Sequence, residues 1–305
     1  MKPALIIGST CVDIIIHIDH LPKTEENLHP TSQTMALGGC AYNVAHMMRL
    51  FHAPHTFITP IGTGIYGDYV IHQLTALQIP LSVRVPNQEN GCCYCLVESG
   101  GERTFLSVHG AEYTFQKSWM DSYPAEDYQF VYICGLEIEE STGMQLIEYL
   151  EEHPCLKVCY APGPRGAILS SEKAQRMLSL HPLLHINEQE ALALSGCSAF
   201  QNAAEVLYAQ TRNTVIITLG AQGTYCKEQD GKTFFISFVP AKHVVDTIGA
   251  GDAHIGTILA LLTKGYSLRK AISCANLVSA AVVETSGATI SAEQLPAALS
   301  QYLKA

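Results

Sequence analysis

The feature that most constrains the fold of this chain is a repeated alternation between short apolar runs and longer segments with helical spacing. When strands and helices alternate, each helix carries the chain back so that neighbouring strands run parallel and helices cover both faces of the sheet. The sequence therefore predicts an α/β fold, a three-layer α/β/α sandwich with a mostly parallel central sheet. The predicted strands span residues 4–7, 56–59, 130–134, 156–160, 183–186 and 215–219, and the predicted helices include 41–51, 66–77, 143–152 and 188–194.

Two segments do not follow this alternation. Residues 12–36 begin with a weak period of two and turn polar around 22–34, which indicates an exposed strand and a long loop. Two strand-like runs, 92–98 and 103–108, flank Ser99-Gly100-Gly101-Glu102, which is typical of a hairpin. We expect these segments to form a small separate β-sheet, a lid built from about 12–37 and 90–115, on a single domain spanning 1–305.

Composition narrows the classes of partner. The 305 residues carry a formal net charge of −10 and contain no lysine and arginine cluster, so no nucleic-acid partner is expected. No run approaches the roughly 18 apolar residues of a membrane span, so no membrane partner is expected. The first apolar run is short and soon followed by Asp13, unlike a signal peptide. The 11 cysteines do not have zinc-finger spacing. In a chain without a signal peptide, such cysteines favour reduced thiols and a cytoplasmic location.

The strongest chemical motif is Asp246-Thr247-Ile248-Gly249-Ala250-Gly251-Asp252, followed by a predicted helix over 253–262. Glycines at the start of a helix let backbone N–H groups converge, and the helix dipole adds positive potential, so together they bind anions. A carboxylate beside a phosphate site is a poor phosphate ligand but a suitable base for an attacking hydroxyl. Asp252 is therefore the candidate base; the alternative is an aspartate that only caps the helix.

This motif resembles the C-terminal signature of the PfkB, or ribokinase-like, carbohydrate kinases, Asp-Thr-x-Gly-Ala-Gly-Asp. Residues 38–45, Gly-Gly-Cys-Ala-Tyr-Asn-Val-Ala, resemble the family's N-terminal signature Gly-Gly-x-x-x-Asn-x-Ala. The resemblance implies a ribokinase-like fold and ATP-dependent transfer of the γ-phosphoryl group to a hydroxyl. Asp252 would be the catalytic base, and the amides of Gly249, Ala250 and Gly251 would stabilise the charge that moves with the phosphoryl group.

The resemblance also implies a substrate site. Asp13, shortly after the first strand, matches an aspartate that binds substrate hydroxyls, and Gly39 and Asn43 match the rest of that site. Glu137 resembles a second substrate-side acid. Without the resemblance, Asp13 reads as a turn residue and Glu137 as a solvated acid at a helix start.

The nucleotide side is implied by further matches. Asn187 and Glu190 resemble an Asn-x-x-Glu motif linked to phosphate and to Mg²⁺ held through water, while Asn187 alone reads as a helix N-cap. Asp246 and Thr247 lie where many relatives bind a monovalent cation. The implied cofactors are thus ATP, Mg²⁺ and a monovalent cation such as K⁺. The remaining nucleotide-side candidates are Thr218, Gly220 and Gly223, otherwise an ordinary β-turn, and Asn276 near the adenine.

Departures from the family pattern argue against ribose as the substrate. Cys40 stands where ribokinase has a lysine, and His254 replaces a usual phenylalanine. Three functions remain open: a sugar kinase, a nucleoside or pseudouridine-type kinase favoured by Tyr42 and the missing lysine, and a sensor that binds a sugar or nucleotide without catalysis. Strand edges of a lid often pair between subunits, so we also expect a homodimer through the lid.

Overall fold

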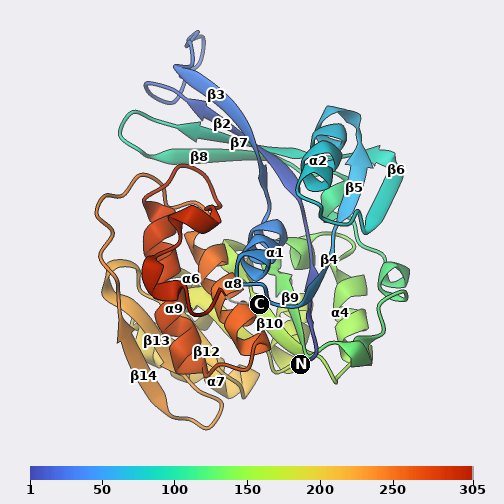
Figure 1. Ribbon diagram of the computed structural model, residues 1–305, viewed down its shortest axis with the longest axis vertical. Helices are drawn as coiled ribbons and strands as arrows, with labels where there is room; N and C mark the ends of the chain where they lie inside the picture. Colours follow the sequence, from blue (N-terminus) through green and yellow to red (C-terminus); the bar gives the residue numbers. More distant parts are fainter. Residues whose placement is uncertain (304–305) are drawn as a thin grey trace.

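The computed structural model describes residues 1–303, and its centre is an eight-stranded sheet between two layers of helices (Figure 1). The strands from β4 to β12 run parallel, and the last two, β13 and β14, are antiparallel. The predicted sandwich with a mostly parallel sheet is confirmed. In spatial order the strands are β14 (Thr233–Ser237), β13 (Gly223–Lys227), β12 (Val215–Thr218), β11 (Leu183–Asn187), β10 (Lys157–Ala161), β9 (Phe130–Cys134), β1 (Ala4–Ile7) and β4 (His55–Ile58).

Each face of this sheet has its own hydrophobic core, because side chains alternate between the faces along a strand. In β1, Ala4 and Ile6 belong to one core, and Leu5 and Ile7 belong to the other. The first core packs against α1 (Cys40–Leu50), α8 (Ala250–Thr263) and α9 (Leu268–Val283). The second packs against α4 (Gly143–Glu152), α5 (Ser171–Ser179), α6 (Glu188–Ser195) and α7 (Phe200–Thr211).

A separate four-stranded sheet lies at the top of Figure 1, with its strands in the order β3, β2, β7, β8. The predicted hairpin is confirmed, since β7 and β8 pair antiparallel, and β2 pairs parallel with β7. Its role as a lid, and the lid boundaries, stay predictions. The strands are β3 (Ser32–Gly38), β2 (Cys11–His17), β7 (Cys92–Val97) and β8 (Arg103–Val108).

Four further elements lie between the two sheets or beside them. Helix α2 (Gly64–Ala76) packs against β5 (Pro60–Thr63), which pairs with β6 (Val83–Glu89). The short helix α3 (Gly135–Glu139) follows β9 directly. Within the described part of the chain, no helix has the length and apolar character needed to cross a membrane.

The structure differs from the sequence prediction at several elements. Helix α8 begins at Ala250 and not at 253, so Asp252 lies in its first turn. Strand β3 includes residues 32–34, which the sequence assigned to the loop. The sequence resembles a loop there because the first half of the strand is exposed and polar. Strands β5, β6, β13 and β14 were not predicted. Strand β14 shows why: its burial alternates and leaves Phe235 exposed, so it lacks the continuous apolar run used to recognise the other strands.

Candidate active site

Asp252 lies in the first turn of α8, directly after a glycine in the left-handed conformation. Gly249 is the N-cap with φ 72°, and a Cβ there would come within 2.2 Å of the carbonyl oxygen of Ala288. Only glycine fits this close approach without strain. The first amides of a helix have no partner inside the helix, so those of Gly249 and Gly251 can face an anion, while that of Ala250 makes a long hydrogen bond of 3.4 Å to the carbonyl oxygen of Thr247. The predicted cradle and candidate base are therefore adjacent on one rigid element.

Asn43, from α1, holds the Asp252 carboxylate. Its Nδ2 donates a hydrogen bond of 2.8 Å to Asp252 Oδ2, although the two residues are 209 positions apart. Asn43 is buried, and its Oδ1 has no hydrogen-bond partner among residues 1–303. A buried acceptor without a partner is costly, so this oxygen is suited to a hydroxyl donor from a ligand.

Asp13 reaches the same region from β2 of the four-stranded sheet. Asp13 pairs with Ala36 on β3, and Gly38 lies two residues further along that strand. A Cβ at Gly38 would lie 2.1 Å from Asp13 Oδ2 and 2.5 Å from its Oδ1, so the carboxyl fits only because residue 38 is glycine. Gly39 follows with φ 101° and starts α1 as its N-cap. Its missing side chain allows close approach to Ser9, whose carbonyl oxygen would be 2.6 Å from a Cβ. Thus the glycine pair brings Asp13 and α1 together.

Glu137 lies in α3 and is completely buried, which contradicts its reading as a solvated acid. Its Oε1 accepts hydrogen bonds of 2.9 Å from both the backbone N–H and the Oγ of Ser9. Its Oε2 is buried without a hydrogen-bond partner in the described part of the chain. Glu137 therefore anchors the turn after β1, and a direct contact with substrate stays a prediction.

Burial raises the proton affinity of the three carboxyl groups. Burial raises the pKa of Asp252 to about 6, with Glu137 and Asp13 adding to the rise and hydrogen bonds from Asn43 and Cys40 opposing it. Burial likewise raises the pKa of Asp13 to about 6 and raises that of Glu137 above its usual range. A carboxyl near neutrality in a cleft has the proton affinity that suits a general base.

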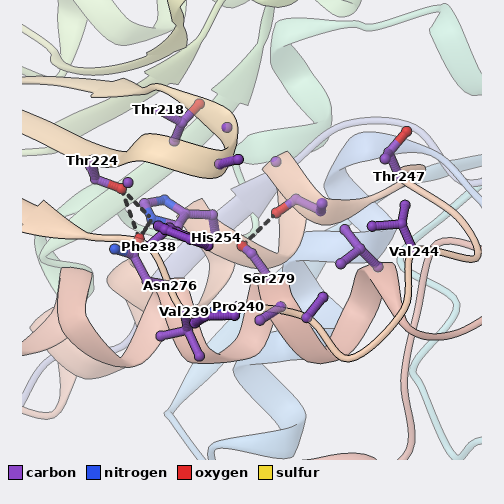
Figure 2. Close-up of a pocket in the computed structure, with 18 residues that line it drawn as sticks. Thr218, Thr224, Phe238, Val239, Pro240, Val244, Thr247, His254, Asn276 and Ser279 are labelled. Carbon is purple, nitrogen blue, oxygen red and sulfur yellow. Dashed lines mark hydrogen bonds between the residues drawn. The ribbon is translucent and has the colours of Figure 1, made fainter.

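A cavity of about 500 Å³ opens beside the start of α8 (Figure 2). This size suits a nucleotide-sized ligand. One wall is apolar, and the other carries the predicted nucleotide-side loop, with Thr218, Gly220 and Gly223 in the lining as expected. The apolar wall is formed by Phe238, Val239, Pro240, Val244, Ala280 and Val283.

Asn276 lines this cavity, but its amide is already occupied. Its Oδ1 accepts hydrogen bonds of 2.7 Å from Thr224 and 2.9 Å from His254 (Figure 2). Its Nδ2 donates to the backbone carbonyls of Ile236 and Ser237. His254 in turn is 2.8 Å from His185. Burial lowers the pKa of His254 to about 4, so this pair is neutral. Asn276 thus holds the cavity wall in place, and its contact with adenine stays a prediction.

A second, smaller cavity of about 210 Å³ adjoins the first, and Thr218 and Gly251 line both. Asp252 faces this second cavity together with Asn187 and Glu190. The predicted N-cap is confirmed: Asn187 Oδ1 accepts from the Glu190 backbone N–H at 2.8 Å, and Glu190 Oε2 accepts from that of Asn187 at 3.0 Å. The side-chain oxygens of Asp252, Asn187 and Glu190 in this lining fit a hydrated Mg²⁺ delivered with phosphates.

Asp246, the other predicted cation ligand, is already fully engaged. Its Oδ1 accepts from the backbone N–H of Ile248 at 2.7 Å and its Oδ2 from that of Gly287 at 2.9 Å. Arg103 of β8 also forms an ion pair with Oδ1. The residues present therefore do not fit a monovalent cation on this carboxylate. Thr247 lines the larger cavity.

Some residues of these cavities were not among the predicted site residues. Arg165 lines the smaller cavity and pairs with Glu139 at 3.0 Å, and Cys40 lines it beside Asp252. The only signal for Arg165 in the sequence was a partial match between the segment around it and a motif of the family. The apolar wall over 238–244 gave no signal, because it is an irregular loop without periodicity. Neither cavity lining includes Asp13 or Asn43.

This fold and this site define a small-molecule kinase: a glycine cradle opens a helix beside two adjoining cavities, Gly251 lines both of them, and the next residue, Asp252, brings a carboxylate to the smaller one. The model of the pfkB family of carbohydrate kinases matches residues 1–295, and the chain belongs to this family.

Three relatives illustrate the similarity. A protein of Escherichia coli K12 called uncharacterized sugar kinase YegV is 27% identical over 286 residues, covering 92% of this chain and 88% of the relative. The structure of ribokinase from Arabidopsis thaliana, complexed with ribose and ATP, has a TM-score of 0.79 at 20% identity and covers 99% of both chains. A structure from E. coli in complex with ATP and Mg²⁺ has a TM-score of 0.79 at 20% identity, covering 97% of this chain and 96% of that one.

Proposed function

We propose that this protein transfers the γ-phosphoryl group of ATP, with Mg²⁺, to a hydroxyl of a neutral sugar or sugar-like polyol, with Asp252 as catalytic base. The observation that carries the proposal is the position of the Asp252 carboxylate, which Asn43 holds in the wall of the smaller cavity, next to Gly251, which lines both cavities. The family membership supports the reaction type, and the ligands of the two solved structures support ATP and Mg²⁺ as cofactors.

On the donor side, the larger cavity would bind the adenine and ribose against its apolar wall. Thr218, Gly220 and Gly223 would lie along the phosphates, since glycines permit close backbone approach. Asn187 and Glu190 would hold the waters of Mg²⁺ at the smaller cavity. ATP supplies the phosphoryl group, and Mg²⁺ offsets its negative charge.

On the acceptor side, Asp13, Gly39 and Asn43 would position the substrate so that one hydroxyl meets Asp252. Asp252 Oδ1 is the oxygen not engaged by Asn43, so it would accept the proton as that hydroxyl attacks. The amides of Gly249, Ala250 and Gly251 would stabilise the charge that develops on the transferred group.

A neutral substrate is favoured by the charge of the acceptor site. Burial is the largest cause of the raised pKa of Asp13, of Glu137 and of Asp252, and Glu137 and Asp13 add to the rise at Asp252. The groups that oppose these rises are thiols and neutral hydrogen-bond donors, not cations. A phosphorylated sugar would add further negative charge beside these carboxyls, and like charges in a desolvated site repel. Hydroxyl groups, by contrast, can donate to the acceptors Asn43 Oδ1 and Asp13.

We expect the enzyme to prefer neutral sugars over phosphorylated ones by at least about 100-fold in kcat/KM, which corresponds to about 2.7 kcal/mol. The test is a panel of pentoses, hexoses, ketoses and nucleosides with ATP and Mg²⁺, beside ribose 5-phosphate and fructose 1-phosphate. ADP release and the mass of the phosphorylated product are measured together. A preference for a sugar phosphate would contradict the neutral class.

The same panel separates the other two functions. A product formed only from nucleosides would identify the nucleoside kinase. This alternative has weaker support, because Tyr42 packs with its ring buried in the hydrophobic core beside α1. If calorimetry detected binding of a sugar but no product formed, the protein would be a sensor.

The activity should depend on pH through the raised pKa of Asp252. The base accepts a proton only as the carboxylate, so a pKa of about 6 means that half of the sites are inactive at pH 6. We expect log kcat/KM for the sugar to be flat above about pH 7 and to fall with unit slope or steeper below 6, because Asp13 titrates in the same range. Full activity at pH 4.5 would contradict the assignment.

The four-stranded sheet is proposed to act as a lid and as the surface of a homodimer. Its edge strand β8 exposes large apolar side chains on both faces, namely Phe105, Leu106 and Val108, which supports pairing with a second copy. A lid over the acceptor site would exclude water, which otherwise competes with the sugar hydroxyl. A cytoplasmic location stays a prediction.

A further inference from the structure

An ion pair joins the four-stranded sheet to the loop that leads into α8. Arg103 is the first residue of β8, and Asp246 lies just before the glycine cradle. Both side chains are largely shielded from solvent, with 13% and 3% of their surfaces exposed. Water screens such a pair only weakly. Removal of either charge would leave the other buried and unpaired, which is costly.

Asp246 holds together the backbone segments around the glycine cradle. Its hydrogen bonds hold Ile248 and Gly287, and its own backbone N–H bonds to the carbonyl oxygen of Val283 at 3.1 Å. Gly249 follows two residues after Thr247 and packs closely against Ala288, next to Gly287. The position of the Asp246 carboxylate thus sets the path of the backbone into the cradle.

We propose that Arg103 is a positioning residue that orders the glycine cradle through Asp246, and that its guanidinium supplies the positive charge which the family resemblance assigns to a monovalent cation. This inference rests on the proposed function, because it assigns Arg103 an effect on phosphoryl transfer. It couples the position of the four-stranded sheet to the cradle, since the pair exists only while β8 lies over the loop. It also makes the enzyme independent of K⁺.

The test compares Arg103→Met, which keeps the bulk of the side chain but removes its charge, with Arg103→Lys, which keeps the charge. Arg84→Met is the matched control, because Arg84 is exposed on β6. We expect kcat/KM for ATP to fall at least about tenfold in Arg103→Met and to stay within about threefold of the unmutated protein in Arg103→Lys and Arg84→Met. Amide hydrogen exchange over residues 246–250 should be faster only in Arg103→Met.

A second experiment varies the cation and tests whether the Arg103 guanidinium takes the place of a monovalent cation, the second half of the proposal. In the unmutated protein, replacing tetramethylammonium chloride with KCl at equal ionic strength should change the rate less than about twofold. In Arg103→Ala, which leaves room beside Asp246, KCl or guanidinium chloride at low millimolar concentration should restore activity at least about threefold. Strong K⁺ stimulation of the unmutated protein would overturn this half.

Unchanged exchange over 246–250 and unchanged kcat/KM in Arg103→Met, relative to the Arg84 control, would overturn the positioning role. Failure of Arg103→Lys to restore exchange protection would show that charge is not what orders the loop. The exchange measurement needs no substrate. If the unmutated protein phosphorylated nothing, the proposed function would fail while the effect of Arg103 on the loop could still be read.

Discussion

Asp252→Asn is expected to lower kcat by about 10³-fold, the range in which a positioned general base acts. Asparagine has nearly the same shape as aspartate but cannot accept the proton of the attacking hydroxyl. Its amide oxygen can still accept the 2.8 Å hydrogen bond from Asn43, so the local geometry should persist. The measurements are kcat by ADP release and nucleotide affinity by calorimetry, which should stay within a few-fold.

Stability separates this effect from misfolding. Burial raises the folded-state pKa of Asp252 to about 6, so the folded protein binds this proton more tightly than the unfolded chain does. The carboxylate therefore opposes folding above about pH 6, and a neutral asparagine removes that cost. We expect the Tm of Asp252→Asn at pH 8 to equal or exceed that of the unmutated protein.

Asp68→Asn on the exposed side of α2 is the matched control and should change neither rate nor Tm. If Asp252→Asn retained more than a tenth of the rate, another group would have to be the base.

Gly251→Ala is expected to lower kcat/KM for ATP by about 100-fold without loss of stability, as happens when reacting groups are displaced by about 1 Å. Gly251 lines both cavities, and a Cβ there meets no protein atom within 4 Å, so the new methyl group would occupy space where phosphates pass. Since alanine favours helix over glycine by about 1 kcal/mol, Tm should stay constant or rise. Rate assays at varied ATP and thermal unfolding are the measurements.

Gly249→Ala provides the contrast, two residues away in the same motif. Its φ of 72° is left-handed, and its Cβ would collide with the Ala288 carbonyl oxygen at 2.2 Å. We expect this variant to lose stability by at least about 2 kcal/mol from backbone strain alone, together with activity. If Gly251→Ala bound ATP and turned over normally, the cradle would not lie where phosphates bind.

The sequence determined the framework of this protein. Apolar runs and helical periodicity specify strands and helices because both depend on neighbours within a few residues. The same is true of the glycine motif over 246–252, whose turn and helix start are local features. The predicted sandwich, the hairpin of β7 and β8, and the N-cap at Asn187 follow from such local patterns.

Only the tertiary structure decided which side chains meet. Asn43 and Asp252 are 209 residues apart, and no local pattern encodes their contact. The pairing of Arg103 with Asp246, the buried position of Glu137 and the apolar wall over 238–244 likewise arise from the packing of the two sheets and the loops between them. A side chain's partners, burial and pKa depend on three-dimensional neighbours, so the sequence could name the candidate base but not the groups that hold and tune it.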